Sequence, residues 1–402
     1  MSRYVIHSDE ALVFRDGRPF GDAGIVDSGI VQWPLPPTII GMMRTQVGLS
    51  RDPGYFSDPG KRQHNIRRIK SITSDLILPM WQEAHKSEWR FLYPVPADAL
   101  LLDGQDASCY SVHGFAFHKP EEDEGINLPW SNWLLPTTTS REKPAQDAPG
   151  LWFEEKFFTW LQNYTFPDEL QFRELGVPWP QVETRMHTAI GTFGTAQTGQ
   201  LFSTQGIRLQ SAGKGKRESK GRYGIGVVLS GLEPGDNPTG ACRFGGERKI
   251  GQVELQPVDF PACPGWFEED RFLRLVLISP GNFGSWAPDW LRPSPNESET
   301  PWRELPQSAI KVRLVSAFIP RWMPVSGWDF EQRQPRATRK LVPAGAVYVI
   351  KLHRPEESPE AARLLWGRSI ADDPDGSNGY DVVCVGKLNV TDHGGKHTEI
   401  VE

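Results

Sequence analysis

Hydrophobic residues along the chain occur in short runs and in alternating stretches, a pattern that predicts strands joined by many turns. Residues 182–186 and 201–203 alternate between side chains that suit two opposite faces of a sheet. Other runs, such as FLRLVLISPG, are apolar throughout and predict buried strands. The predicted strands lie within 3–14, 71–79, 181–191, 200–210, 224–232, 272–281, 310–320, 342–352 and 377–390.

Apolar residues at helical spacing predict three helices. The first begins at Pro36-Pro37, follows the apolar positions Ile39, Met42 and Val47, and ends at Gly48. Arg44 projects from it. The other two lie within 151–164 and 355–368; the latter has a Pro-rich start, an acidic first turn and Arg at its end.

Length and composition then narrow the fold class. A chain of 402 residues exceeds one ordinary core and predicts two domains. The 39 Gly and 35 Pro disfavour a helical bundle. We expect two α+β domains, each an antiparallel sheet with helices on one face. Residues 50–180 read as irregular and predict a large insertion into the first domain.

Targeting signals and cysteine positions bear on the expected cellular location and on disulfide or zinc chemistry. The sequence has no apolar run of about eighteen residues and no secretion signal at its start, so we expect a cytoplasmic protein. Cys109, Cys242, Cys263 and Cys384 are scattered, which argues against a disulfide framework and a thiolate zinc site.

Residues with catalytic potential are few. His187 can serve as an acid–base group for RNA cleavage or have a structural role within its strand. His393 and His397 have a spacing seen in metal sites, but no further ligands cluster with them in the sequence. No established catalytic motif is present, so we expect no catalytic residue, no metal and no cofactor.

Positive charge is concentrated locally although the formal net charge is −6. Residues 311–340 contain seven basic and two acidic residues, and 208–222 contain six and one. Arg333 and Arg336 flank Gln334-Pro335 and therefore lie on a loop. Such clusters are either solvated surfaces, docking sites for acidic proteins, or phosphate-binding sites; their repeated position at strand ends favours single-stranded nucleic acid.

Five stretches together resemble a known family. They are LVFRDGRPF, PLPPTIIGMMRTQVG, ETRMHTAIGTFGTAQTGQLFSTQGIRL, GGERKIGQVEL and PVSGWDFEQRQPRATRKLVPAGAVYVIKL. SPGNFGSWAPDWL adds to the likeness. In this order they resemble the RAMP-superfamily subunit of type III-B (Cmr-type) CRISPR effector complexes that holds the crRNA 5′ handle.

The resemblance implies two ferredoxin-like (RRM-like) domains, at 1–235 and 236–402, with the insertion at 50–180. It implies a non-catalytic RNA-binding subunit for antiviral defence, in which a thumb-like hairpin kinks the RNA. The implied partners are crRNA, the large polymerase/cyclase-like subunit, the first backbone RAMP subunit and, through the complex, target RNA.

The resemblance also implies RNA-binding residues. Arg15, Arg18 and Arg44 map near the handle, and Arg185 and Arg208 flank the hairpin. Lys214, Lys216 and Arg217 lie on the candidate thumb, Arg333, Arg336, Arg339 and Lys340 on the late basic loop, and Gly376, Asn378 and Gly379 on a short C-terminal Gly-rich loop.

Two other functions stay open at this stage. One is a metal-independent crRNA-processing endoribonuclease of the same superfamily with His187 as base. The other is a Trp-rich carbohydrate-binding β protein, since the chain has 15 Trp. Trp328, Phe330 and Phe193 lie near basic residues and can either stack on bases or pack in the core.

Overall fold

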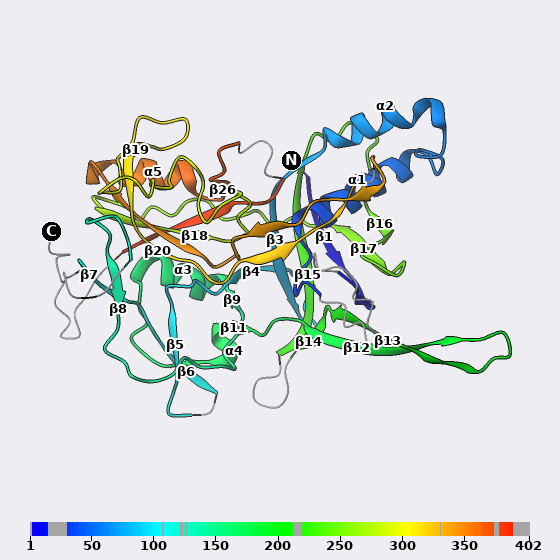
Figure 1. Cartoon of the computed structure of the whole chain (residues 1–402), viewed down its shortest axis with the longest axis horizontal. Coiled ribbons are helices and arrows are strands. Elements are labelled where there is room, and N and C mark those ends of the chain that lie inside the picture. Colours follow the sequence, from blue (N-terminus) through cyan, green and yellow to red (C-terminus); the bar gives the residue numbers. More distant parts are fainter. Residues whose placement is uncertain are drawn as a thin grey trace. The chain divides into compact units, whose positions relative to one another are not determined.

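The computed structural model describes residues 2–14, 30–106, 108–120, 124, 127–212, 219–329, 331–373 and 378–388. It is a mixed α+β structure with mostly antiparallel strand pairs, as predicted. The chain divides into two compact units, each assembled from three stretches of sequence. Unit 1 comprises Met1–Phe91, Trp179–Val258 and Pro324–Lys340, and unit 2 comprises Leu92–Pro178, Asp259–Met323 and Leu341–Glu402 (Figure 1).

These units differ from the predicted division at residues 235 and 236. That boundary would separate β17 (Ile250–Leu255) from β1 (Ser2–His7), with which it pairs along four residues. The predicted insertion at 50–180 is divided between the two units. Residues 92–178 belong to unit 2, and the rest of the insertion belongs to unit 1. The late basic segment 324–340, which leads into a strand of the second unit, itself belongs to unit 1.

Unit 1 is built on four antiparallel strands in the spatial order β17, β1, β15 (Ser219–Ser230) and β3 (Thr73–Glu83). Numbered along the chain, this is the order fourth, first, third, second. The edge strand β16 (Gly240–Arg243) extends the sheet beyond β17, and β14 (Gln210–Ala212) pairs with β15. Buried side chains of β1 and β15 form the centre of its core.

Two helices of unit 1 connect β1 with β3. Helix α1 (Pro36–Arg51) begins at the predicted prolines and buries Ile39, Ile40, Met43 and Val47. The predicted end at Gly48 is wrong, because the helix continues for three more residues. A Cβ at position 48 would lie 2.8 Å from the Tyr55 ring, so this glycine permits close packing and does not end the helix.

Helix α2 (Pro59–Lys70) was not predicted. Its sequence is strongly basic, and only Ile66 and Ile69 are buried. The side chain of Asp58 caps its start by accepting a hydrogen bond from the Gly60 N–H at 2.9 Å. Pro59 occupies the first turn, where its missing N–H has no intrahelical partner to lose. Local capping therefore defines a helix that apolar periodicity does not reveal.

The remaining strands of unit 1 form smaller groups. One three-stranded sheet contains β12 (Gln181–Ile190), β13 (Ala196–Arg208) and β2 (Ala11–Leu12). The late segment contributes β22 (Trp328–Asp329) and β23 (Gln334–Pro335), which pair, and β24 (Arg339–Leu341), which pairs with β21 (Met323–Val325).

Unit 2 repeats the strand order of unit 1. Its four antiparallel strands lie in the order β20 (Lys311–Phe318), β25 (Val347–Leu352), β18 (Phe272–Leu277) and β27 (Val382–Lys387). Numbered along the chain, this is the order second, third, first, fourth, which is the order of unit 1 read from the opposite edge of the sheet. The connection from β25 to β27 contains η2 (Pro355–Glu357) and the predicted helix, α5 (Ser358–Leu365). Short strands β19 (Arg303–Glu304) and β26 (Arg368–Ser369) lie at the two edges.

The prediction of irregular structure through 50–180 is wrong. The predicted helix in this region is confirmed as α3 (Glu154–Asn163), and short strands occupy much of the rest. Because these strands are mostly two to five residues long, they show little periodicity. The first of them, β4 (Arg90–Pro94), begins in unit 1 and ends in unit 2. The others belong to unit 2 and are β5 (Leu100–Asp103), β6 (Cys109–His113), β7 (Ala116–His118), β8 (Leu135–Thr137), β9 (Leu151–Phe153), β10 (Leu170–Gln171) and β11 (Gly176–Val177), with the single-turn helix α4 (Phe172–Leu175).

A buried arginine joins these accessory elements to the main sheet of unit 2. Arg274, on β18, is inaccessible to solvent and lies 2.8 Å from the Asp98 carboxylate, which is also buried. Its guanidinium also donates to the carbonyls of Trp160 and Lys387, and lies 4.3 Å from the centre of the Tyr164 ring. The buried guanidinium is therefore bound by a carboxylate, by backbone carbonyls and by an aromatic ring. Among the described residues, no helix has the length and apolar composition needed to cross a membrane.

Candidate RNA interface

A two-stranded hairpin in unit 1 is largely exposed and carries two of the predicted site residues. Strands β12 and β13 pair from Gln181↔Arg208 to Ile190↔Ala196, and the hairpin extends away from the main sheet of unit 1 (Figure 1). At its base, β13 pairs with β2, which leads along the chain to the segment of Arg15 and Arg18. The hairpin is thus attached to a strand that precedes one of the predicted near-handle segments in the sequence.

One face of the hairpin is charged. Arg185 and Arg208, both predicted RNA-binding residues, share the carboxylate of Glu183; the Arg185 Nε donates to it at 2.5 Å. The hydrogen bonds from Arg208 and Arg185 hold the pKa of Glu183 below its usual range. On the same face, the His187 Nε2 lies 2.8 Å from the Thr204 hydroxyl across the two strands. A single carboxylate therefore aligns two guanidiniums along the ribbon.

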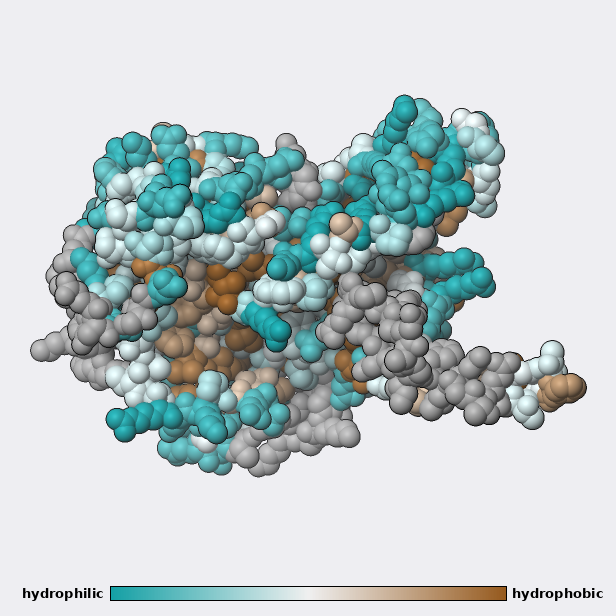
Figure 2. Space-filling view, in the orientation of Figure 1, coloured by the Kyte–Doolittle hydropathy of each residue, from teal (hydrophilic) through white to brown (hydrophobic). Residues whose placement is uncertain are grey.

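The opposite face carries exposed apolar side chains among polar ones, and the sequence did not reveal their exposure. Val182, Met186 and Ile190 follow one another at four-residue intervals on β12 and are 44%, 59% and 70% exposed. Phe193, in the connecting turn, is 94% exposed. Figure 2 shows hydrophobic colour at the far end of this hairpin. The signal in the sequence was the spacing of Val182 and Met186, because residues an even number apart lie on one face of a regular strand; the pairing shifts register between Thr188 and Ile190.

The predicted thumb loop lies on a second, shorter hairpin. Strands β14 and β15 pair antiparallel, with Gln210 opposite Arg222 and Ala212 opposite Ser219. Lys214, Lys216 and Arg217 belong to the connection between them and lie outside the described residues. The loop therefore connects paired strands, as predicted.

The late basic segment forms a compact exposed turn. The Asp329 carboxylate accepts hydrogen bonds from the N–H groups of Glu331 and Gln332, both at 2.9 Å, and stabilises the turn between β22 and β23. Arg333 has a positive φ of 54°, and the Arg336 N–H donates to the Gly327 carbonyl at 2.8 Å. The four predicted basic residues Arg333, Arg336, Arg339 and Lys340 are all exposed.

Contacts within unit 1 bring this segment to Arg44 and to α2. Lys70, the last residue of α2, forms an ion pair with Glu331. Arg44 donates to the carbonyls of Ile72 at 2.9 Å and Lys70 at 3.1 Å. Burial, and then the positive charge of Arg336, lower the pKa of Arg44. The structure therefore brings together predicted residues that lie almost 300 positions apart in the sequence.

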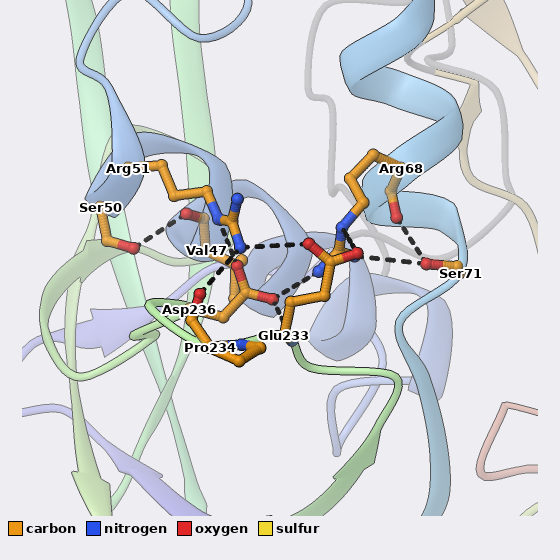
Figure 3. A network of polar contacts seen from close by, with 8 residues as sticks. All are labelled: Val47, Ser50, Arg51, Arg68, Ser71, Glu233, Pro234 and Asp236. Carbon is orange, nitrogen blue, oxygen red and sulfur yellow. Dashed lines mark hydrogen bonds and ion pairs between the residues drawn. The ribbon is translucent and has the colours of Figure 1, made fainter.

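An ion-pair network fixes the two helices beside this segment (Figure 3). Asp236 binds Arg51 of α1 at 2.5 Å and Arg68 of α2 at 2.6 Å, and Glu233 lies 2.7 Å from Arg68. Burial alone raises the pKa of Asp236, but the Glu233 N–H and the Arg51 guanidinium hold it below its usual value. Both acids lie on the connection that follows β15, so this loop holds the helices in place.

The other predicted residues are not brought into this cluster. Asn378 and Gly379 have positive φ values of 47° and 88° and form a turn in unit 2. The predicted residues outside the described ranges are Arg15, Arg18, Lys214, Lys216, Arg217 and Gly376. Of the proposed stacking residues, Phe193 is exposed, whereas Phe330 and the side chain of Trp328 lie outside those ranges. Within the described ranges no acid, His or Cys group is arranged to hold a metal; His393 and His397 lie beyond them.

Comparison with known proteins decides the family. A family model described as CRISPR-associated protein (Cas_Cmr3) matches residues 4–385, nearly the whole chain. The chain belongs to the Cas_Cmr3 family. The resemblance inferred from the five sequence stretches, to a subunit of type III-B CRISPR complexes, is thereby confirmed. None of the curated proteins compared with this Cas_Cmr3 sequence matches it.

Solved structures give more distant likenesses to this Cas_Cmr3 chain. A chain of the type III-B Cmr-beta complex bound to cognate target RNA and AMPPnP, solved by cryo-EM, is 16% identical with a TM-score of 0.42, and 86% of each chain is covered. A chain of the Csm3–Csm4 subcomplex of the type III-A interference complex, from a crystal structure, is 10% identical with a TM-score of 0.32; 97% of this chain and 100% of that one are covered. The family match, not these likenesses, carries the assignment.

Proposed function

We propose that the chain is a non-catalytic RNA-binding subunit of a type III-B CRISPR effector complex that holds the crRNA 5′ handle on unit 1. The observation that carries this proposal is the position of the late basic segment. It brings Arg336 near Arg44 and Glu331 to Lys70 at the end of α2, while Arg333, Arg336 and Arg339 are exposed. The chain belongs to a family of CRISPR-associated proteins, and the sequence resemblance implies the handle as ligand.

The chemistry of this region suits phosphate. Exposed guanidiniums bind phosphate oxygens in a bidentate manner, and the bonds are charge-assisted. Among the described residues, the acid that faces Arg336 is Asp329, which is 3.8 Å away and already accepts two backbone hydrogen bonds. The lowered pKa of Arg44 reflects burial and like-charge repulsion, and an anion bound between Arg44 and Arg336 would relieve the repulsion.

The thumb that kinks the RNA is proposed to be the β12–β13 hairpin, alone or with the basic loop that follows β14. An isolated two-stranded ribbon is marginal in water. Its exposed apolar side chains therefore suggest that this hairpin is covered when the complex forms. Phe193, at the turn, can stack on an unstacked base, while Arg185 and Arg208 on the other face can bind the backbone.

Both units are proposed to be ferredoxin-like RAMP domains. A ferredoxin-like domain has the chain order β-α-β-β-α-β. Unit 1 retains the helical connection between its first two core strands, and unit 2 retains the helix between its last two. Docking to the large polymerase/cyclase-like subunit and to the first backbone RAMP subunit, and through them to target RNA, is part of the same proposal.

Charge reversal tests the proposed handle site. The Arg336→Glu/Arg339→Glu variant is expected to bind crRNA with lower affinity and a flatter dependence on salt, because fewer counterions are released. The slope of log affinity against log salt should fall by about 0.7 for each phosphate that the variant no longer binds. Arg321→Glu/Arg368→Glu, an equal change on exposed residues of unit 2, is the matched control. Equal affinity and slope for the two variants would contradict the proposal.

The proposed lack of catalysis has its own test. Purified full-length chain incubated with repeat RNA should leave it intact. Cleavage that disappears in His187→Ala would instead support the processing endoribonuclease, since His187 is the candidate base. Cleavage that persists in this variant would point to contamination or to another residue, and repeating the assay with an independently purified preparation separates these two causes.

A further inference from the structure

Arg222, on β15, is a half-buried arginine that lies outside the set of predicted site residues. It pairs with Gln82 of β3 on one side and with Gln210 of β14 on the other. Its Nε donates to the Gln82 Oε1 at 2.7 Å, and its Nη1 lies 3.3 Å from the Nδ1 of His7, on β1. The guanidinium carbon lies 5.2 Å from the centre of the Trp89 ring. Two neighbouring strands and the residue before β4 therefore fix the position of this charge.

The hydrogen-bond partners of Arg222 are themselves held in the orientation that accepts from it. The Gln82 amide donates from its Nε2 to the Ser87 carbonyl at 2.8 Å, so its oxygen faces Arg222. A guanidinium can only donate, so the His7 Nδ1 is the acceptor, and the proton on its Nε2 is donated to the Glu254 carboxylate at 3.0 Å. Gln82 and His7 are both buried. The protein itself therefore fixes both acceptors.

Trp89 reaches the guanidinium because a glycine of β15 leaves room for its ring. A Cβ at Gly224 would lie 2.6 Å from a ring carbon of Trp89. The ring is buried and stacks on His7 with centroids 6.0 Å apart. Indole is the best aromatic partner for a cation, and the contact restricts the arginine side chain without neutralising its charge.

The hydrogen-bonding and stacking partners of Arg222 among the described residues are all neutral. Arg274 and Arg313 also lie on aromatic rings, but each pairs with a carboxylate: Asp98 at 2.8 Å and Glu299 at 3.9 Å, respectively. Within the part of the chain that the structure describes, no carboxylate forms an ion pair with Arg222, and its hydrogen bonds use two of its five N–H groups. The site is therefore complete except for an anion.

Arg222 lies where the two proposed thumb elements meet. Its partner Gln210 follows Arg208, the last residue of β13, by two positions. Strand β15 begins two positions after Arg217 of the basic loop, and its exposed Lys220 precedes Arg222 by two positions. An RNA backbone that follows both elements would pass this guanidinium.

We propose that Arg222 is a preorganised binding site for one phosphate of the RNA backbone, between the β12–β13 hairpin and the basic loop that follows β14. This inference rests on the proposed function and extends it. The remaining N–H groups of the guanidinium can bind two phosphate oxygens through charge-assisted bonds, independently of base sequence. Gln82, His7 and Trp89 are positioning residues, because they orient the side chain and reduce the entropy lost when phosphate binds.

Arg222→Gln in the full chain tests the site. Fluorescence anisotropy with labelled crRNA should show about tenfold weaker binding, because a charge-assisted contact is lost. Over a salt series, the slope should fall by about 0.7, the value for one phosphate on a single strand. Arg313→Gln is the matched control, since it also removes a half-buried strand arginine that stacks on a tryptophan, but one already paired with a carboxylate. The control should change neither affinity nor slope.

A second variant keeps the arginine but occupies it. Gln82→Glu places a carboxylate beside the Arg222 Nε, and the resulting ion pair competes with phosphate. Affinity for crRNA should fall although circular dichroism shows a folded protein. A set of crRNAs, each with one neutral methylphosphonate linkage in the handle, then locates the contact. One such linkage should weaken binding to the natural chain but not to Arg222→Gln; if every linkage affects both proteins equally, the proposal is wrong.

The outcomes separate this inference from the proposed function. If Arg222→Gln and Gln82→Glu bind like the control while Arg336→Glu/Arg339→Glu loses affinity, the Arg222 site is rejected and the handle site stands. If only the Arg222 and Gln82 variants lose affinity, the Arg222 site stands and the late basic segment does not hold the handle. If no variant differs from the control, both proposals fail.

Two further results would overturn the Arg222 site. A lower Tm without a change in affinity assigns Arg222 to the fold. Normal RNA binding with failure to assemble with partner subunits shows that Arg222 binds an acidic protein surface. Should Arg222→Gln not fold, the affinity of Gln82→Glu decides, because that variant retains the arginine and its contact with Trp89.

Discussion

The two units have the same order of four antiparallel strands but differ in what surrounds it. In unit 1 the helices α1 and α2 lie between the first and second core strands, whereas in unit 2 the helix α5 lies between the third and fourth. The strand order depends on pairing across the sheet, so the connections can change without disturbing it. Helices, hairpins and loops therefore distinguish the two units.

Arginine shows this difference most directly. Unit 2 buries Arg274 with Asp98 among carbonyls and aromatic rings, and the charge serves packing. Unit 1 exposes Arg333, Arg336 and Arg339 on a segment whose turn is held by hydrogen bonds from the Glu331 and Gln332 N–H groups to Asp329. Exposed ion pairs contribute little to stability, so surface arginines can exchange partners for a phosphate at small cost. The comparison predicts that the same residue type affects folding in unit 2 and binding in unit 1.

The largest effect is expected from Arg274→Ala. The substitution leaves the Asp98 carboxylate buried without its charge partner and should lower the free energy of unfolding of unit 2 by about 3–5 kcal/mol. Chemical denaturation followed by tryptophan fluorescence measures this change. Arg321→Ala, an exposed arginine of the same unit, is the control and should have little effect. Equal stability of the two variants would refute the structural role of Arg274.

Asp381 is expected to make the stability of unit 2 depend on pH. Burial raises its pKa from 3.8 to about 7; the hydrogen bond from the Asn282 N–H opposes the shift, and the nearby Asp372 carboxylate adds to it. The folded state therefore holds a proton that the unfolded state releases at lower pH. Stability contributed by this group is present below about pH 4 and is lost as the pH rises to about 7.

Asp381→Asn tests this linkage. Asn tolerates the positive φ of 67° at this position and can accept the same hydrogen bond, but it has no charge to bury. The variant should have a higher Tm than the natural sequence at pH 8 and nearly the same Tm at pH 4. Thermal melts of both proteins between pH 4 and pH 8 measure this difference in Tm. A Tm difference that does not vary with pH would show that the Asp381 carboxyl does not titrate as described.

A smaller effect on folding is expected in unit 1 from Asp236→Ala. This change removes an acceptor shared by Arg51 and Arg68, and should cost about 1–3 kcal/mol. Hydrogen–deuterium exchange should increase in α2 more than in the central strands of the sheet. Glu88→Ala, at an exposed position between β3 and β4, is the control. Unchanged exchange in α2 would show that the network does not position this helix.

The smallest effect on stability is expected from Phe193→Ala, because the ring is 94% exposed. Its effect should appear in binding instead: loss of a stacked base costs about 1–3 kcal/mol. Affinity of the assembled complex for RNA, with Thr192→Ala as the neighbouring control, measures this difference. A change in Tm without a change in affinity would place Phe193 in the fold and not in the RNA interface.

Sequence patterns predicted the elements that carry strong periodicity. The start of α1, helix α3, helix α5 and the long apolar strands follow directly from apolar spacing. Helix α2 escaped prediction because its stability comes from the Asp58 cap and from ion pairs to Glu233 and Asp236, about 170 residues away in the chain. The spacing of apolar residues within a segment carries no information about partners so far away in the sequence.

The candidate site, too, could be predicted from the sequence only in part. Charge counts identified Arg333, Arg336 and Arg339 as a basic loop, because residues that are close in the sequence reveal a charge cluster without a structure. Its membership of unit 1 was not predictable, because the segment lies between two strands of unit 2. The exposed apolar side chains of the β12–β13 hairpin were overlooked because alternation usually marks burial, and only the structure shows that Met186 and Ile190 are exposed.

The central claim is that unit 1 holds the crRNA handle through the late basic segment. Ultraviolet crosslinking of the assembled complex, followed by mass spectrometry of RNA-linked peptides, tests this most directly. Handle nucleotides are expected on peptides containing residues 331–340. Handle crosslinks confined to other subunits, or to peptides of unit 2, would contradict the claim.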